Sequence, residues 1–250
     1  MIVIKVSGHV LQDPGLRMDF AEWVKGLDQP AIIVHGGGQE LDDVQSKLGI
    51  PIRKNDGLRI TDAETLDAAL MVLSGLTNKR LVSALITVGV EAIGLSGVDA
   101  SLIQVKKLED SEMDFGYVGE VDRIQDALLA DLTERGLCVV ISPLSIGPDG
   151  QIFNVNADQV AGAIASSLKV EHLIFLSNVP GVRADGELIR QLSPSQVESY
   201  IREQKITGGM IPKVRAGAEA LGSGVARVQI ADMESLRSSG GTFLLRNNHV

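Results

Sequence analysis

The stretch Ala31-Ile32-Ile33-Val34-His35-Gly36-Gly37-Gly38 decides the fold of this chain. Four consecutive apolar, mostly β-branched residues are typical of a strand that is buried on both faces. The glycines end that strand, and Leu41, Val44 and Leu48 then recur at helical spacing. A buried strand that passes through a glycine turn into an amphipathic helix is the repeating unit of an α/β protein with a parallel sheet.

The same alternation runs along the rest of the chain. The apolar runs predict strands at 2–6, 92–95, 137–141, 172–176 and 225–230, helices at 16–27, 62–86, 157–168 and 211–221, and hairpin-like ribbons at 50–60, 114–121 and around 148–150. Continuous apolar strands between helices indicate a mainly parallel sheet that helices cover on both faces. Since no flexible linker is present, we expect two lobes that share one continuous sheet, with a boundary near 170–176.

Composition and charge exclude several classes of protein. The 250 residues are 44% apolar and 22% charged, which is ordinary for a globular chain. The net charge of −9 argues against binding to nucleic acid or to anionic membranes. One cysteine, Cys138, allows neither a disulfide framework nor a cysteine zinc site, and we expect it to be a small buried hydrophobe. Without a signal-like start or a run of 18 apolar residues, the predicted location is the cytoplasm, with no membrane partner.

Two features near the first strands could bind an anion. Lys5 lies inside the apolar run 2–6, where a charge is costly unless it reaches a partner or a ligand. The alternative is an edge strand from which the side chain reaches water. The run Gly36-Gly37-Gly38 leaves backbone N–H groups bare at a helix N-terminus, which suits phosphate or carboxylate, although it could also be a simple tight loop. His35 is expected to be a structural hydrogen-bonding residue.

Three later motifs add charged and polar groups. Arg59, in a glycine-kinked ribbon, has a planar fork that suits a carboxylate, although a surface salt bridge is the commoner role. Asn156 is a good N-cap and places Asp158 in the first helical turn, whereas capping does not explain Asn154. Lys213 also lies in a first turn, where the helix dipole opposes a cation unless an anion lies in front. Two lysines, an aspartate and bare N–H groups suit phosphoryl transfer.

The sequence resembles the amino-acid kinase family, and most closely its acetylglutamate kinase branch. The matching segments follow the family's order and spacing over nearly the whole chain, at 5–8, 35–38, 56–61, 94–97, 154–159, 177–182 and 208–213. The resemblance implies a three-layer αβα sandwich, with an acyl-amino-acid-binding and dimerisation lobe at 1–171 and a nucleotide-binding lobe at 172–250. It also implies ATP-dependent phosphorylation of the side-chain carboxylate of N-acetyl-L-glutamate to an acyl phosphate, in arginine biosynthesis.

The resemblance further implies a role for each matching residue. Lys5 and Lys213 would stabilise the transition state, and Asp158 would organise them. The acetylglutamate would be held by Gly37, Gly38, Arg59, Asn154 and Asn156. ATP would be bound by Gly8, Ser177, Asn178, Val179, Pro180, Gly181, Val182, Lys205, Ile206 and Thr207. Magnesium would arrive with the nucleotide, so no protein metal site is expected.

Two departures from the family pattern leave alternatives open. Ser7 stands where the family usually has a second glycine. Asn178 stands where an aspartate is common, and this form also resembles kinases of carrier-protein-linked aminoadipate. The segments 57–59 and 154–158, in contrast, match the acetylglutamate type. Other family members act on uridylate, carbamate, glutamate or aspartate. A catalytically inactive ligand-binding regulator is a further alternative, against which the joint presence of both lysines and Asp158 argues.

The chain starts at its first predicted strand. Arginine-inhibited relatives carry an additional N-terminal helix that links dimers into hexamers. We therefore expect a homodimer without strong arginine feedback, and the resemblance suggests the helix at 62–86 as its contact surface.

Overall fold

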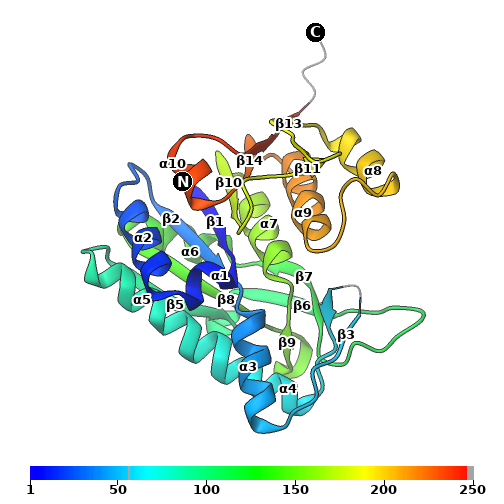
Figure 1. Cartoon of the computed structure of the whole chain (residues 1–250). Helices are drawn as coiled ribbons and strands as arrows, with labels where there is room; N and C mark the ends of the chain where they lie inside the picture. Colours follow the sequence, from blue (N-terminus) through cyan, green and yellow to red (C-terminus); the bar gives the residue numbers. More distant parts are fainter. Residues whose placement is uncertain (56, 247–250) are drawn as a thin grey trace.

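The computed structural model describes residues 1–55 and 57–246 and is built around one eleven-stranded sheet (Figure 1). The strands follow the order β13-β15-β14-β10-β1-β2-β8-β6-β7, and β5 and β9 also pair with β8. Their bounds are β1 Ile2–Val6, β2 Ala31–His35, β5 Ala92–Gly97, β6 Ile103–Lys107, β7 Gly119–Ile124, β8 Cys138–Ile146, β9 Ile152–Asn154, β10 His172–Leu176, β13 Gln191–Leu192, β14 Arg227–Ala231 and β15 Thr242–Leu244. Among these, only the pairs β14–β15, β6–β7 and β8–β9 are antiparallel.

Helices cover both faces of this sheet, and two small ribbons lie outside it. The ribbons are β3 Lys54–Asn55 with β4 Leu58–Arg59, and β11 Arg183–Ala184 with β12 Glu187–Leu188. The helices are α1 Gly8–Gln12, α2 Pro14–Lys25, α3 Gly38–Leu48, α4 Ala63–Ala69, η1 Leu70–Thr77, α5 Asn78–Thr87, η2 Asp99–Ser101, α6 Asp126–Glu134, η3 Pro148–Gly150, α7 Ala157–Ser167, α8 Pro194–Arg202, α9 Met210–Gly222 and α10 Met233–Arg237. The predicted αβα architecture is confirmed.

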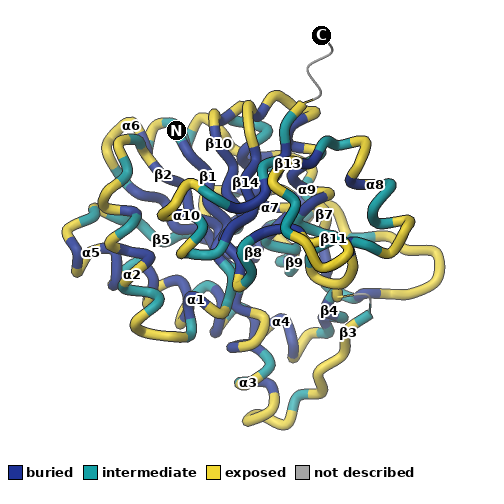
Figure 2. The backbone as a smooth tube through the Cα atoms, turned by 45° about the horizontal axis from the view of Figure 1, so that its top comes forward, coloured by how far each residue is buried: buried dark blue, intermediate teal, exposed yellow. Residues whose placement is uncertain are grey.

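Alternate residues of β1 enter two different cores. Ile2, Ile4 and Val6 pack with residues of α2 and α5, whereas Val3 packs with residues of α7 and α9 on the opposite face. Figure 2 shows the central strands as the most deeply buried part of the chain. This alternation matters for the site, because Lys5 must leave the sheet on the face of Val3.

The strands predicted from apolar runs are confirmed with small shifts in their ends, and Cys138 is buried as expected. Burial raises the pKa of its thiol to about 12. Two interpretations were wrong. The edge-strand explanation of Lys5 fails, because β1 lies between β2 and β10. The ribbon at 114–121 is also corrected, since its second half belongs to β7, which pairs with β6 in the main sheet.

The predicted long helix is present from residue 63 to residue 87, but its middle part, η1, is a π-helix. Asp62 caps its start by accepting a hydrogen bond from the Thr65 amide at 2.9 Å. By length and composition this helix could cross a membrane. Leu66, Leu73 and Leu81 on one side of it nevertheless pack in the protein interior, which is sufficient to explain its apolar character.

The sheet passes without interruption across the predicted lobe boundary, because β1 of the first lobe pairs along its whole length with β10 of the second. The division into lobes at 171/172 stays a prediction.

Gly116 holds the segment before β7 against the end of the β3–β4 ribbon, and its replacement tests this packing. Gly116 has φ +70°, and a Cβ there would lie 2.3 Å from the Thr61 carbonyl oxygen. We expect Gly116→Ala to lower the free energy of unfolding by about 3 kcal/mol, through backbone strain and overpacking.

The matched control is Gly186→Ala. Gly186 has φ +85° and no atom within 4 Å of the added Cβ, so this variant carries only the cost of the conformation, about 1 kcal/mol. Chemical denaturation of both variants measures the difference, and equal losses would contradict the packing argument.

Candidate active site

Lys5, Asp158 and Lys213 meet at the carboxyl-terminal edge of the sheet. Lys5 comes from the central strand β1, Asp158 from the first turn of α7, and Lys213 from the first turn of α9. The Lys5 Nζ lies 3.1 Å from Asp158 Oδ1, and the Lys213 Nζ lies 3.1 Å from Asp158 Oδ2. One carboxylate thus spaces two ammonium groups, and this relation between distant segments is the one the sequence predicted.

All three side chains are largely shielded from water, with exposed fractions of 9% for Lys5, 6% for Asp158 and 14% for Lys213. Burial lowers the pKa of Lys5, and the Lys213 charge adds to this, whereas the Asp158 charge opposes it. Burial by itself would raise the pKa of Asp158, but the charges of Lys5 and Lys213 outweigh burial and lower it. Asp158 therefore stays ionised at neutral pH and supports the charge of both lysines.

Two glycine turns face each other beside Lys5. A Cβ at Gly8 would lie 3.7 Å from Gly37 Cα, and a Cβ at Gly36 would lie 3.9 Å from Lys5 Nζ. Gly37 has φ +150°, and a Cβ there would approach Leu73 Cδ2 to 2.6 Å, so a side chain does not fit. The bare N–H groups at the start of α3 are therefore open to the space in front of Lys5, where they favour an anion.

His35 has the structural role that the sequence predicted. Its Nδ1 lies 2.8 Å from the Gly36 carbonyl oxygen, and its Nε2 lies 3.2 Å from Asn78 Nδ2. Burial lowers its pKa to about 4, so the ring is neutral at physiological pH. His35 therefore ties the glycine turn to the long helix and carries no charge to the site.

Arg59 is buried and is held from several sides by α3. Its guanidinium donates to Gln45 Oε1, to the Gly38 carbonyl oxygen at 2.9 Å and to Asp42 Oδ1. Asp42 also accepts from Lys54 Nζ at 2.6 Å. Arg59 thus forms a salt bridge, as the commoner alternative predicted, but it lines a cavity rather than the open surface. Its role in binding a ligand carboxylate stays a prediction.

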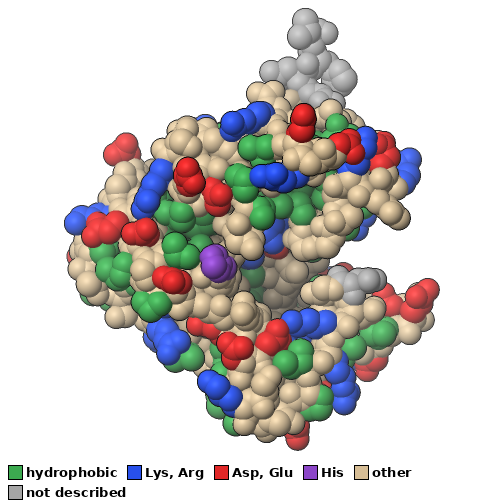
Figure 3. Space-filling view, in the orientation of Figure 1, with side chains coloured by type: hydrophobic (Ala, Val, Ile, Leu, Met, Phe, Trp, Pro, Cys, Tyr) green, Lys and Arg blue, Asp and Glu red, His purple; other side chains and the backbone are tan. Residues whose placement is uncertain are grey.

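One cavity of about 390 Å³ joins Lys5 and Asp158 to the glycine turn at 36–38 and to Arg59, whereas Lys213 and Gly8 are not among its described lining residues. Seven predicted site residues line it, namely Lys5, Gly37, Gly38, Arg59, Asn154, Asn156 and Asp158. Asn156 caps α7 by accepting from the Asp158 amide at 2.8 Å, and Asn154 donates to Thr61 Oγ1 at 3.3 Å. Figure 3 shows a deep cleft on this side of the molecule, between the part with α8 and α9 and the part with the β3–β4 ribbon.

The segments predicted to bind the nucleotide lie outside this cavity. The segment 177–182 follows β10, and both Ser177 and Val182 are buried. In the second segment, Ile206 is buried, and the Lys205 Nζ pairs with Glu203 at 2.9 Å and lies 5.2 Å from the Tyr200 ring centroid. The backbone groups of Val182 are also used within the protein, since its amide donates to Thr242 Oγ1 at 2.8 Å and its carbonyl oxygen accepts from the Ile189 amide at 2.9 Å. Nucleotide binding by these segments stays a prediction.

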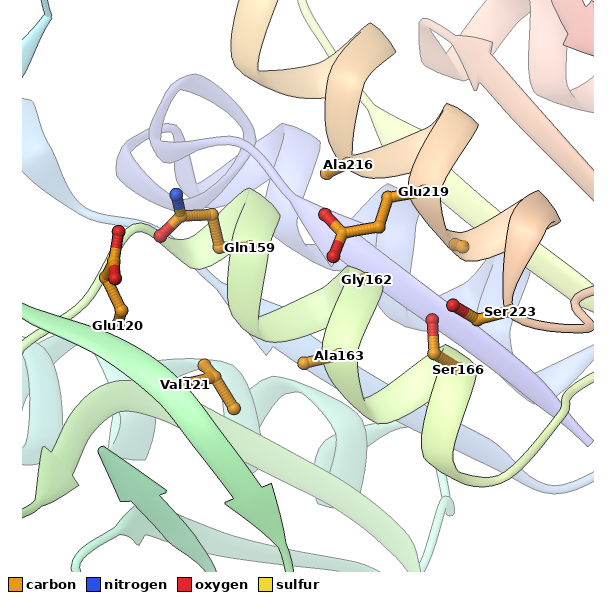
Figure 4. Close-up of a pocket in the computed structure, with 10 residues that line it drawn as sticks. Glu120, Val121, Gln159, Gly162, Ala163, Ser166, Ala216, Glu219 and Ser223 are labelled. Atoms are coloured by element: carbon orange, nitrogen blue, oxygen red, sulfur yellow. The ribbon is translucent and has the colours of Figure 1, made fainter. Parts of the chain in front are cut away.

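A second cavity of about 350 Å³ lies between α7, α9 and β7 (Figure 4). Glu120 and Glu219 face it, and none of its described lining residues is a lysine or an arginine. This charge pattern does not suit a phosphate. The helices α7 and α9 pack closely against each other at Gly162, where a Cβ would lie 3.3 Å from the Ala216 carbonyl oxygen. The close approach of these helices brings Asp158 and Lys213 together.

Comparison with known proteins places this geometry in a family. A sequence model described as the amino acid kinase family matches residues 1–232. The chain belongs to the amino acid kinase family. An acetylglutamate kinase of Roseiflexus sp. (strain RS-1) is 44% identical over 243 residues, which cover 97% of this chain and 93% of that protein. An acetylglutamate kinase of Methanopyrus kandleri is 41% identical over 252 residues, which cover 98% of this chain and 100% of that protein.

Solved structures agree with this assignment of the fold. The smu.665 protein of Streptococcus mutans superposes with a TM-score of 0.86 at 29% identity, covering 98% of both chains. N-acetylglutamate synthase of Neisseria gonorrhoeae, complexed with coenzyme A and N-acetyl-glutamate, has a TM-score of 0.86 at 26% identity, over 98% of this chain and 59% of that one. Carbamate kinase of Giardia lamblia, at 13% identity and a TM-score of 0.71, shares the fold.

Several residues of this amino acid kinase site were not predicted from its sequence. Asp42 and Gln45 hold Arg59, and Lys54 and Leu73 line the cavity. Asp42 and Gln45 are three residues apart on α3, so helical spacing after the glycine turn could have revealed them as one face. Leu73 gave no such signal, because its position depends on the π-helix η1.

Replacement of Asp158 by Asn tests the electrostatic link in this kinase site. The variant keeps the side-chain shape but removes the charge that raises the pKa of Lys5, so that pKa falls below its wild-type value. Because a lysine is charged only below its pKa, we expect kcat to be lower and its decline at alkaline pH to begin at a lower pH than in the wild type.

The pH profile of kcat measures this shift. Asp122→Asn is the control, since Asp122 is 44% exposed and pairs with Lys106 on the outer strands. If kcat declined at the same alkaline pH in the wild type and in Asp158→Asn, the role of Asp158 in supporting the charge of Lys5 would be contradicted.

Proposed function

We propose that this protein transfers the γ-phosphoryl group of ATP to the side-chain carboxylate of N-acetyl-L-glutamate, giving an acyl phosphate in arginine biosynthesis. The acetylglutamate kinases that are 41–44% identical over nearly the full chain support this reaction. The observation that carries it is a single cavity lined by both Arg59 and the Lys5–Asp158 pair. Arg59 supplies a cation for one carboxylate of the acceptor, and the lysines face the site of transfer at the other.

The chemistry follows from these positions. A carboxylate is already ionised at neutral pH, so its oxygen attacks the γ-phosphorus without a general base while the bond to the ADP oxygen breaks. Lys5 and Lys213, spaced by Asp158, neutralise the charge that spreads over the transferring group. The N–H groups of Gly8, Gly37 and Gly38 orient its oxygens. Asn154, at the end of β9, and Asn156, the N-cap of α7, contact the acceptor.

Three further parts of the proposal concern the metal ion, the oligomeric state and the location of the enzyme. Magnesium, when bound, would neutralise phosphate charge. It would be held mainly by the phosphates, since no group of three acidic, His or Cys ligands occurs in residues 1–55 and 57–246.

We infer a homodimer that uses the helix 63–87, whose outer side exposes Met71, Leu76 and Ile86. A cytoplasmic enzyme without nucleic-acid or membrane partners is consistent with its charge and its small-molecule acceptor.

A carrier-linked acceptor is the second candidate, favoured by the form of the segment around Asn178. The loop beside the cavity argues against it. This loop runs to Val118, which lines the cavity, and it exposes Glu109, Asp110 and Glu112. Such a rim repels an acidic carrier protein.

An acceptor panel tests the proposed function. ADP formation from ATP is measured with N-acetyl-L-glutamate, glutamate, aspartate, carbamate, uridylate and a carrier protein charged with aminoadipate. We expect N-acetyl-L-glutamate to give the highest kcat/KM, because its free carboxylates match the cations in the cavity. No stimulation by N-acetyl-L-glutamate would overturn the proposal, and turnover with the charged carrier alone would establish the second candidate.

Arg59→Lys tests the acceptor position. A lysine cannot keep the planar fork that Asp42, Gln45 and Gly38 orient, so we expect the KM for N-acetyl-L-glutamate to rise about tenfold or more with a smaller change in kcat. The control is Arg135→Lys on α6, where the arginine is 69% exposed and pairs with Asp131. An unchanged KM in Arg59→Lys would contradict the placement.

A further inference from the structure

Buried polar atoms without hydrogen bonds point to a further ligand contact. In the described part of the chain these side-chain atoms are Ser7 Oγ, Asp158 Oδ1 and His172 Nε2. Asp158 Oδ1 is compensated by the charge of Lys5 at 3.1 Å. His172 lies at the opposite end of the sheet, at the start of β10. Ser7 Oγ is left as an uncompensated hydroxyl at the active-site end of β1, and such a group normally has a partner.

The strand places this hydroxyl on the catalytic face. Ser7 continues β1, since its amide donates to the Leu176 carbonyl oxygen at 3.1 Å and its backbone is extended, with φ −74° and ψ 152°. Side chains two residues apart in extended backbone share a face. Ser7 therefore lies on the same face as Lys5, which points to Asp158, and not on the face of Val6.

Local structure does not use the hydroxyl. Ser7 precedes α1 in the N-cap position, but its side chain makes no capping hydrogen bond. The next residue, Gly8, faces the glycine turn at 36–38, where an anion fits. A serine hydroxyl is a neutral donor that can rotate toward a phosphate oxygen.

We propose that the Ser7 hydroxyl donates a hydrogen bond to a non-bridging oxygen of the γ-phosphoryl group of ATP. It adds a side-chain donor to the backbone N–H groups of Gly8 and Gly37. In the free protein the donor lacks a partner, and the nucleotide supplies one. This inference rests on the proposed function only in requiring that the chain binds ATP.

Ser7→Ala separates this role from a structural one. In the free protein it removes a buried hydroxyl that has no partner, so we expect an unchanged or higher Tm. We expect the affinity for AMP-PNP, which carries a γ-phosphate, to fall about tenfold, as for a lost hydrogen bond to a charged group. The affinity for ADP, which lacks the γ-phosphate, stays within twofold of the wild type. Isothermal titration and thermal unfolding give these values.

Two variants complete the design. Ser7→Thr retains a hydroxyl and is expected to keep most of the AMP-PNP affinity. Thr133→Ala removes a buried hydroxyl that bonds only within α6, so it lowers the Tm and changes neither nucleotide affinity. An AMP-PNP affinity of Ser7→Ala within twofold of the wild type, or equal losses for AMP-PNP and ADP, would overturn the inference. The titrations contain no acceptor, so their result is independent of the acceptor panel.

Discussion

The ion pairs of Asp158 with Lys5 and Lys213 are the interaction on which the rest of this structure depends. Two ammonium groups so close together repel each other, and burial adds a further cost to each charge. The carboxylate compensates both at 3.1 Å. To bring the three groups together, the fold must align a central strand with the first turns of two helices that are far apart in the sequence. The parallel sheet does this, because its strands end at one edge.

Glycines allow segments of the chain to pack closely at two places on which this alignment depends. Gly37 leaves no space for a side chain beside Leu73, and Gly162 lets α7 and α9 approach closely. The glycine-rich composition of the chain thus has a local purpose. It opens N–H groups to an anion at the turn 36–38, and at Gly162 it sets the spacing of the helices that carry Asp158 and Lys213. The acidic protein thereby gains a cationic site, although its net charge has the opposite sign.

Much of the site was predictable because its residues break local rules. Lys5 interrupts an apolar strand, and Lys213 lies in a first helical turn that disfavours a cation, so each implied an anion nearby. Asp42 and Gln45 break no such rule, since polar residues on a helix surface are ordinary. Their role became visible only when the β3–β4 ribbon brought Arg59 against α3. The π-helix that carries Leu73 was equally hidden, because its apolar spacing matches that of an α-helix over one turn.

The sequence by itself determined the α/β class, most of the strands, the N-cap at Asn156, and the family. These follow from local periodicity, capping chemistry and ordered motifs. Tertiary structure alone decided that β1 is a central strand, so that the Lys5 ammonium group is shielded from water. It also decided which partners hold Arg59 and that the Ser7 hydroxyl is buried without one. The physical reason is that burial and pairing depend on segments that fold together from distant parts of the chain, which no local pattern records.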